Sequence, residues 1–441
     1  SRGTRKMNFK KSTELRKRSH GIIPGGAHTY AKGDDQYPEN SPGFLVRGEG
    51  CHVWDMDGNE FIEYGMGLRS VTLGHGYKPV IDAAYRQMQM GINFTRPSPI
   101  EVECAEKLAS FITSAEMVKF GKNGSDATSA ALKLARAYTG RDLVAICAEQ
   151  PFFSVDDWFI GSTEMPGGIP QAVRDMTVKF HYNDIESIKT LFTQYPGQIA
   201  CLIMEAERTE PPVGNFLHQT MELCHQNGAL FILDEIITGF RWDLGGAQRI
   251  YRIQPDLSAF GKAMANGFSI SALVGKKEFM EAGGIYHDRE RVFLLSLTFG
   301  AEAHSLAAAL ETMKIYENNP VIEHLQRQGE RLTKGINQAV EANHLQGYFG
   351  VDGRACNLIY NTRDENKQPS QPFRTLFLQE IIKQGIIAPS LVVSYSHTDQ
   401  DIDQTVDAIA NALQVYAKAL DEGVEKYLVG KSVKPVMRKY C

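Results

Sequence analysis

Between about residues 100 and 275, short apolar segments alternate with amphipathic ones, and this alternation constrains the fold more than any other feature of the sequence. The apolar segments are continuous rather than alternating, which is typical of strands covered on both faces. The segments Ser125–Tyr138 and Phe216–Asn227 have the pattern of amphipathic helices. Strands and helices in alternation predict an α/β fold with a mostly parallel sheet. The apolar segments are MVKFG, LVAICA, IACLIME, ALFILDE and SALVG.

The flanking regions have different patterns and predict a second, smaller domain. Residues 43–64 contain short strand-like pieces separated by turns, which predict antiparallel hairpins. After about residue 320, long amphipathic helices dominate, with short strands expected at CNLIYN (356–361) and VVSYS (392–396). The expected parts are an N-terminal segment that packs with the small domain, a large domain, and a small α+β domain, at residues 1–80, 81–320 and 321–441. The sequence assigns no role to the tail after about residue 420.

Bulk properties exclude several classes of partner. The formal net charge is −5, so nothing in the charge favours nucleic acid or an anionic membrane surface. No apolar run approaches the ~18 to 20 residues that a membrane span requires. The seven cysteines are scattered and never form a C-x-x-C pair, so we expect reduced thiols, a cytoplasmic protein and no metal site.

A turn followed by a helix predicts an anion site. Asn123, Gly124 and Ser125 come directly after an apolar strand and open an amphipathic helix. Exposed N–H groups at a helix start, a serine hydroxyl and a glycine that admits close approach can together bind a phosphate. Ordinary capping of the helix by Ser125 is the alternative.

Two charged residues are expected at neighbouring strand ends. The segment LFILDEIITGFR places Asp234 at the end of a buried strand, where an acid must be paired or neutralised. The segment DLSAFGKAMANG places Lys262 in a glycine-flanked loop after another strand. Alternatively, Asp234 or Glu235 caps a turn and Lys262 is simply solvated. Ligands of parallel sheets gather at the carboxyl ends of strands, and there a phosphate site, a buried acid and an amine would match what pyridoxal 5′-phosphate (PLP) needs.

The chain resembles the class III PLP-dependent aminotransferases of fold type I, and within them the glutamate-1-semialdehyde aminomutase branch. The resemblance implies a large domain with a mostly parallel sheet and a smaller α+β domain. The matching segments follow the family's order from about residue 20 to 415. They are PGGAHTY, DMDGNEFIEY, LGH, NGSDATSAALKLARAYTGRD, IMEAE, DEIITGFR, PDLSAFGKAMANG, TFGAE and IAPS.

The resemblance also implies roles for individual residues. Lys262 matches the lysine that bonds the cofactor's aldehyde, and Asp234 matches the acid that pairs with its pyridine nitrogen. The turn at 123–125 matches the phosphate site, and Ile236 matches an aliphatic residue packed on the ring. Thr298 matches a threonine that reaches the phosphate of the neighbouring subunit, which implies a homodimer with shared active sites.

Other positions are less determined by the resemblance. Glu205 matches an acid near the cofactor, with a structural ion pair as the alternative. Where the family usually has an aromatic-histidine-glycine motif, this chain has Phe152-Phe153-Ser154, so Phe152 can still stack on the ring while polar contacts from this loop are lost.

The substrate candidates depart from the aminomutase pattern. Lys32 stands where the aminomutase has an arginine, beside His28, Thr29 and Tyr30, and Arg69 replaces a neutral residue. We therefore expect an aminotransferase that moves an amino group from an amino acid, with glutamate as the expected donor, to a polar carbonyl acceptor such as a sugar or nucleotide sugar. Arg69 is the candidate for the donor carboxylate, with an intramolecular salt bridge as its alternative. Glutamate-1-semialdehyde 2,1-aminomutase and a non-catalytic PLP-binding domain are the alternative functions.

Overall fold

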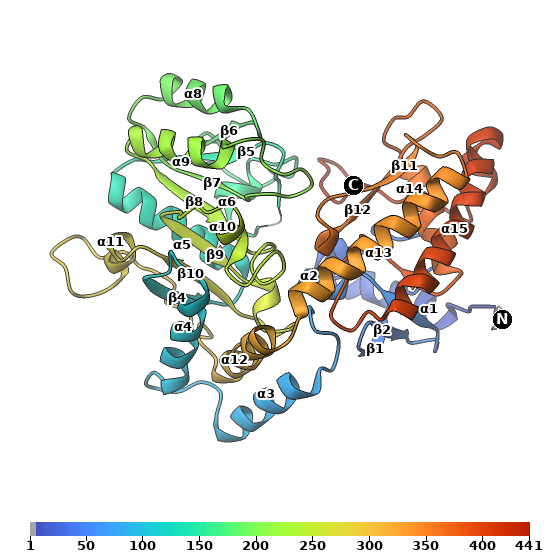
Figure 1. The fold of residues 1–441 in the computed structure, drawn as a ribbon, viewed down its shortest axis with the longest axis horizontal. Coiled ribbons are helices and arrows are strands. Elements are labelled where there is room, and N and C mark those ends of the chain that lie inside the picture. Colours follow the sequence, from blue (N-terminus) through green and yellow to red (C-terminus); the bar gives the residue numbers. More distant parts are fainter. Residues whose placement is uncertain (1–5, 153) are drawn as a thin grey trace. The chain divides into compact units, whose positions relative to one another are not determined.

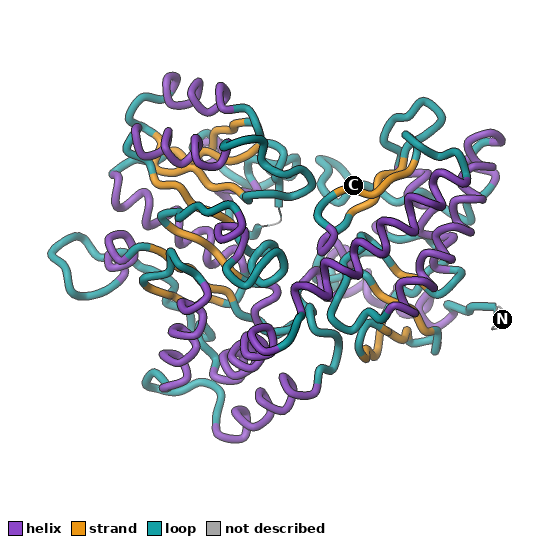
Figure 2. The backbone as a smooth tube through the Cα atoms, viewed as in Figure 1, coloured by secondary structure: helices purple, strands orange, loops and turns teal. Residues whose placement is uncertain are grey.

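The computed structural model describes residues 6–152 and 154–441, and the chain divides into two units. The large unit contains Leu68–Val71, Lys78–Ile322 and Lys439–Cys441. The small unit contains Ser1–Gly67, Thr72–Tyr77 and Glu323–Arg438. Figures 1 and 2 trace both units along the chain.

A seven-stranded sheet forms the centre of the large unit, with strand order β4-β10-β9-β8-β7-β5-β6 (Figure 1). From β9 to β6 all neighbouring strands are parallel, whereas β10 is antiparallel to both β9 and β4. The predicted α/β fold with a mostly parallel sheet is therefore confirmed. The strands are β4 (Met117–Gly121), β5 (Leu143–Cys147), β6 (Thr177–Phe180), β7 (Ile199–Met204), β8 (Leu230–Asp234), β9 (Leu257–Phe260) and β10 (Ser271–Gly275).

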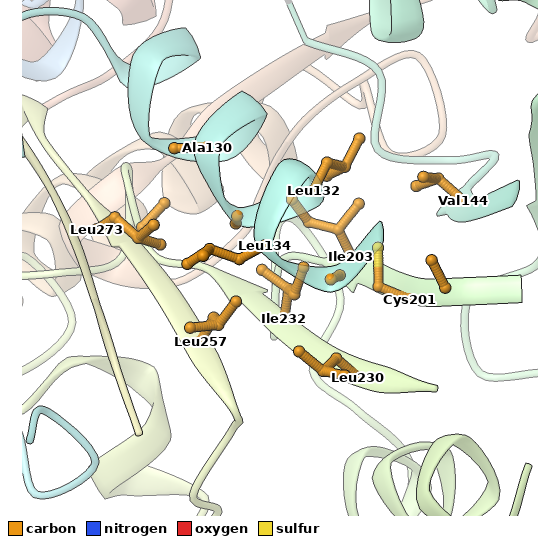
Figure 3. Packing of buried hydrophobic residues seen from close by; sticks show 14 of the residues in the cluster. Ala130, Leu132, Leu134, Val144, Cys201, Ile203, Leu230, Ile232, Leu257 and Leu273 are labelled. Atoms are coloured by element: carbon orange, nitrogen blue, oxygen red, sulfur yellow. The ribbon is translucent and has the colours of Figure 1, made fainter. Parts of the chain in front are cut away.

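Helix α5 (Gly124–Thr139) packs on the sheet through small and branched apolar side chains (Figure 3). Alanines such as Ala131 let the helix approach closely, and Leu134 lies in the same cluster as Ile232 of β8 and Leu257 of β9. Full burial of one leucine contributes about 1.5–3 kcal/mol, so this contact holds α5 against the sheet. The other helices are α3 (Lys78–Met90), α4 (Pro99–Phe111), α6 (Asp157–Ile160), α7 (Gln171–Arg174), α8 (Ile185–Gln194), α9 (Phe216–Gln226), α10 (Gly246–Ile250), α11 (Lys277–Met280) and α12 (Ala303–Asn318).

The small unit contains the expected hairpins and long helices. Its larger sheet has the order β1-β2-β3-β13, with the first three strands antiparallel and β13 parallel to β3. A second sheet pairs β11 with β12. The strands are β1 (Leu45–Glu49), β2 (His52–Asp55), β3 (Glu60–Glu63), β11 (Phe349–Asp352), β12 (Ile359–Thr362) and β13 (Ile386–Ile387). The helices are α1 (Lys10–Ile22), α13 (Val321–Ala342), α14 (Gln371–Ile382) and α15 (Asp399–Glu422).

The strand expected at 392–396 is not formed, and the short strand β13 lies a few residues earlier. The N–H groups of residues 392–396 bond to separate acceptors rather than to one ladder: that of Ser394 reaches His397 Nδ1 at 2.8 Å, and that of Tyr395 reaches the Thr72 carbonyl at 2.8 Å.

Two general features complete the fold. The seven cysteines are free, and all but Cys441 are buried. Among the described residues, no helix has both the length and the apolar character of a membrane span.

Candidate active site

The predicted phosphate turn lies where β4 ends and α5 begins. Asp126 fixes this turn, because its Oδ2 accepts the N–H groups of Lys122 at 2.9 Å and Asn123 at 2.8 Å. Asn123 rather than Ser125 occupies the N-cap position of α5. The capping alternative for Ser125 therefore does not describe this helix, and its hydroxyl lies within the first turn, at the end of the helix dipole that favours anions.

Ile236 connects the phosphate turn to the lysine loop. A Cβ placed on Gly124 would stand 2.6 Å from Ile236 Cδ1, and one on Gly261 would stand 3.5 Å from Ile236 Cγ2. The strands β4, β8 and β9 thus bring residues 124, 236 and 261 to one place at their carboxyl ends. The expectation that these strand ends form one site agrees with this geometry.

The adjacent acids at the end of β8 have different surroundings. Asp234 Oδ1 accepts the N–H of Ile236 at 3.0 Å. Burial, and then the nearby Glu205 carboxylate, raise the pKa of Asp234. Glu235 instead accepts the Ala247 N–H at 2.6 Å and the Gln248 side-chain amide at 2.8 Å, which attaches β8 to the start of α10. Asp234 is therefore the candidate for the acid of the site, and Glu235 holds the following loop.

Lys262 begins a short 3-10 turn after β9 and is partly buried. Its Nζ donates to the carbonyl oxygen of Leu68 at 3.0 Å. Burial, and then the positive charge of Arg69, lower the pKa of the Lys262 amine to about 8. Lys262 is thus not a solvated surface lysine, and the neutral, nucleophilic form of its amine is far more populated near neutral pH than in an ordinary lysine.

Arginines and buried acids surround Lys262. Arg69, Arg241, Asp234 and Glu205 all influence the pKa of the Lys262 amine. Burial, and then Arg241, lower the pKa of Arg69 to about 10. The Arg241 side chain is fully buried, and its Nη2 donates to the Arg69 carbonyl at 3.3 Å. Arg241 was not predicted, although its place in the segment DEIITGFR, which begins at the end of a buried strand, was a usable signal.

Glu205 forms the structural ion pair that was one alternative for it. Its Oε2 lies 2.6 Å from Nη2 of Arg208, and its side chain is almost fully buried. Gln150 holds the backbone of Glu205 by donating to its carbonyl at 3.0 Å and accepting its N–H at 2.9 Å. Arg208 and Gln150 were not predicted from the sequence. The three-residue spacing of Glu205 and Arg208 was a signal for the pair.

Phe152 is placed by a second aromatic ring. Its ring stacks on that of Phe159 with a centroid separation of 3.6 Å and an interplanar angle of 18°. Phe152 and Phe159 line a small cavity together with Asp234 and Glu205. Phe153 lies outside the described residues.

The remaining predicted residues fall in two places. Thr298 is exposed in the loop before α12, where its carbonyl accepts the side-chain amide of Asn93 at 2.9 Å. His28, Tyr30 and Lys32 belong to the small unit and are exposed in this chain.

These residues fit PLP. The glycine at 124 lets the Ile236 side chain approach a helix start that is suited to a phosphate, because a Cβ there would collide with Ile236. Asp234 is a buried carboxylate with a raised pKa, and a protonated pyridine nitrogen would supply the cation it needs. Lys262 offers an amine of lowered pKa. The residues that would hold the cofactor are therefore the 123–125 turn, Asp234, Ile236 and Lys262.

Comparisons with known proteins identify the family. The family model Aminotransferase class-III matches residues 35–413. The chain is similar to a glutamate-1-semialdehyde 2,1-aminomutase of Desulforamulus reducens, with 31% identity over 93% of this chain and 99% of the relative. It is also similar to a 3-aminobutyryl-CoA aminotransferase of Cloacimonas acidaminovorans, with 30% identity over 94% and 99% of the two chains.

A solved structure shows the same fold. The FumI protein of Sphingopyxis sp. MTA144, in a form that contains PLP, has a TM-score of 0.84 and 28% identity to this chain. The match covers 94% of this chain and 98% of FumI. The prediction of PLP-dependent transferase fold type I is confirmed. With its site geometry and its family match over residues 35–413, the chain belongs to the class III aminotransferases and is a PLP-dependent transaminase.

Proposed function

We propose that this transaminase takes its amino group from a donor that carries a carboxylate, with glutamate as the leading candidate, and that Arg69 binds this carboxylate. The observation that carries the proposal is the charge around Lys262. Arg69, Arg208 and Arg241 are basic, while Asp234 and Glu205 are the acids of the same site. A site with more positive than negative charge favours an anionic ligand. Its arginines have lost part of their contact with water on folding, and a bound anion compensates for this loss.

Lys262 is proposed as the catalytic base and acid. PLP, when bound, withdraws electrons from the substrate carbon that carries the amino group. The neutral Lys262 amine would remove the proton from this carbon as a base. The resulting ammonium group would then donate the proton as an acid in the next step of the same half-reaction. Asp234 would keep the pyridine nitrogen of the cofactor protonated, and Ile236 would pack on its ring. The Leu68 carbonyl, 3.0 Å from Nζ, is an acceptor that orients the free amine.

For the acceptor, we propose a polar carbonyl compound, with a sugar or nucleotide sugar as the leading class. The proposal is supported by Lys32, which stands where the resembled aminomutase has an arginine for its substrate, and by the polar residues His28 and Tyr30 beside it. The aminomutase remains the second candidate, because a relative of 31% identity carries that name. The two differ in donor use: an aminotransferase releases a keto product from its donor, whereas an aminomutase has no net donor.

We further propose a homodimer in which Thr298 serves the phosphate turn of the partner. The loop that carries Thr298, helix α3 and the segment just after α3 expose large apolar side chains, and such patches are typical of protein interfaces. The exposed fractions are 58% for Tyr85, 68% for Met90, 48% for Phe94 and 60% for Phe299. The free cysteines support a reducing compartment, so we place the enzyme in the cytoplasm.

A two-stage screen tests the proposed function. Each amino donor is added to the purified enzyme, and the change in cofactor absorbance is recorded together with the keto product. Each carbonyl acceptor is then added, and the return of the original absorbance is followed. We expect glutamate to give 2-oxoglutarate, and a sugar carbonyl to restore the absorbance. Turnover of glutamate 1-semialdehyde without any keto product would instead identify the aminomutase.

A further inference from the structure

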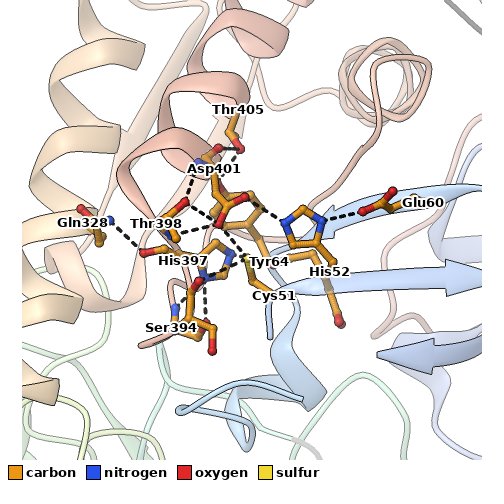
Figure 4. Close-up of polar contacts among 12 residues, drawn as sticks. Cys51, His52, Glu60, Tyr64, Gln328, Ser394, His397, Thr398, Asp401 and Thr405 are labelled. Atoms are coloured by element: carbon orange, nitrogen blue, oxygen red, sulfur yellow. Dashed lines mark hydrogen bonds and ion pairs between the residues drawn. The ribbon is translucent and has the colours of Figure 1, made fainter. Parts of the chain in front are cut away.

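A second cluster of chemically reactive side chains lies in the small unit (Figure 4). Cys51 and His52 lie at the start of β2, and Asp401 lies in the first turn of α15. Cys51 Sγ is 3.3 Å from Asp401 Oδ2, and His52 Nε2 is 2.9 Å from Asp401 Oδ1. One potential ligand atom from each residue lies within 4.8 Å of the others. The fold thus unites two adjacent residues with a third that is 350 positions away.

The groups behind these three side chains have the arrangement that supports metal ligands in proteins. His52 Nδ1 lies 3.0 Å from Glu60 Oε1 on the neighbouring strand β3. A metal-bound histidine usually donates its other ring N–H to a carboxylate, which orients the ring and leaves Nε2 as the ligand. Asp401 Oδ2 accepts the N–H and the hydroxyl of Thr398, both at 2.9 Å, so the carboxylate is also held in place.

Charge and exposure favour a bound cation at the same point. The charged groups that face His52 are the carboxylates of Asp401 and Glu60. If Nδ1–H donates to Glu60, the lone pair of Nε2 faces the lone pairs of Asp401, and a cation between them removes this repulsion. Cys51 is 1% exposed and Asp401 is 8% exposed, whereas the His52 side chain is 33% exposed. The open side at His52 provides an entry path and room for a water ligand.

We propose that Cys51, His52 and Asp401 bind a zinc ion, with water as the fourth ligand, in a structural site separate from the PLP chemistry. A thiolate, an imidazole and a carboxylate form a donor set that selects zinc over magnesium or calcium. Binding displaces the thiol proton of Cys51 to solvent, and the metal takes its place beside Asp401. The ion joins the β1–β2 hairpin to the start of α15. The scattered cysteines led to the prediction of no metal site. The sequence could not indicate this one, because the third ligand, Asp401, is 350 positions away from Cys51.

The chain contains a matched control for this site. Cys224 and His225 form the second Cys-His pair, and His225 Nε2 also bonds to an aspartate, Asp256, at 2.8 Å. Cys224 is as buried as Cys51, yet its sulfur is not part of a three-ligand group among the described residues. Cys51→Ala and Cys224→Ala therefore remove equivalent buried thiols, and only the first removes a proposed ligand.

The test uses the full PLP-loaded enzyme and Zn²⁺ or Co²⁺ alone as probes. Zinc affinity is measured by competition with a chromogenic chelator, and Co²⁺ is followed by the visible bands of a tetrahedral ion. We expect one ion per chain in the parent and in Cys224→Ala. We expect a loss of affinity of at least about a hundredfold in Cys51→Ala, and of about 10–100-fold in Glu60→Gln. Circular dichroism confirms that each variant is folded.

Two results would overturn the proposal. The first is a parent enzyme that keeps no stoichiometric zinc and gives no tetrahedral Co²⁺ spectrum, which would mean that a protonated His52 alone balances Asp401 and Glu60. The second is equal zinc affinity in Cys51→Ala and Cys224→Ala. Either result leaves the transaminase assignment untouched, because the cluster contains none of its residues.

Discussion

Asp234 and Glu235 are adjacent in sequence and both buried, yet their carboxylates bond to different parts of the large unit. Asp234 accepts the Ile236 N–H, and its pKa responds to Glu205 and Lys262. Glu235 accepts donors from Thr238, Ala247 and Gln248. The end of β8 therefore separates a proposed catalytic charge from a structural one, and single substitutions can distinguish them.

We expect Asp234→Asn to slow the proton-transfer step by roughly 10²–10³-fold, because it removes the charge that keeps the pyridine nitrogen protonated. The free energy of unfolding of the cofactor-free protein should change little. Single-turnover kinetics with a saturating donor measure the step. A near-normal rate would remove Asp234 from this role.

Glu235→Gln is the matched control and should show the opposite pattern. The glutamine amide has an N–H group where Glu235 has an acceptor oxygen, so this group faces donors of the 238–248 loop and a buried hydrogen bond is lost. The loss lowers the free energy of unfolding by about 1–3 kcal/mol. Denaturant unfolding of both variants gives the comparison. If Glu235→Gln instead slowed the chemistry more than Asp234→Asn, the two roles would have to be exchanged.

Lys262 should react at lower pH than an ordinary lysine. Burial and Arg69 lower its pKa to about 8, whereas a model lysine has a pKa of about 10.4. Only the neutral amine is a nucleophile, so labelling by acetic anhydride should rise with pH through about 8. Peptide mass spectrometry of the cofactor-free enzyme follows this residue. A midpoint near that of the model lysine would show that the amine is not perturbed.

Arg69→Gln should raise the KM for carboxylate donors by about ten- to a hundredfold, since a hydrogen bond to a charged group contributes about 1.5–3 kcal/mol. Amine donors without a carboxylate should be affected far less. Arg249→Gln removes an exposed arginine of the large unit, paired with Asp243, and serves as the control. Equal losses for both kinds of donor would mean that Arg69 acts on the cofactor or on folding.

The proposed shared site makes a specific prediction for mixed dimers. In a dimer of one Thr298→Val chain and one Lys262→Ala chain, the only site with Lys262 receives an intact Thr298 from its partner. That site should retain PLP as the parent does. Homodimers of Thr298→Val should retain it about ten- to a hundredfold more weakly. Weak retention in the mixed dimer would place the threonine contact within one chain.

Much of the large unit could be predicted from the sequence, because its strands are continuous apolar runs and its site residues follow strand ends. Periodicity carries no strand direction, so the reversed β10 could not be predicted. The contact between Lys262 and the Leu68 carbonyl also left no pattern. It depends on a left-handed turn in which Leu68 has φ 55° and Arg69 has φ 75°, a conformation that non-glycine side chains disfavour and that only tertiary contacts maintain.

The small unit was predicted less completely for a related reason. VVSYS has strand-like composition, but its backbone bonds are distributed over several loops around the buried His397. Burial lowers the pKa of His397 to about 4, so its neutral ring can accept from Ser394 and donate to the Glu63 carbonyl. Such a network joins residues more than 300 positions apart and has no local signature.

The attachment point of the cofactor tests the central claim most directly. The PLP-loaded enzyme is reduced with borohydride, digested, and mapped by mass spectrometry. We predict a single pyridoxyl-modified peptide, with the group on Lys262, and no modified peptide from a Lys262→Ala variant that remains folded. Modification of a different lysine in the parent, or retained covalent cofactor in Lys262→Ala, would contradict the assignment of this site.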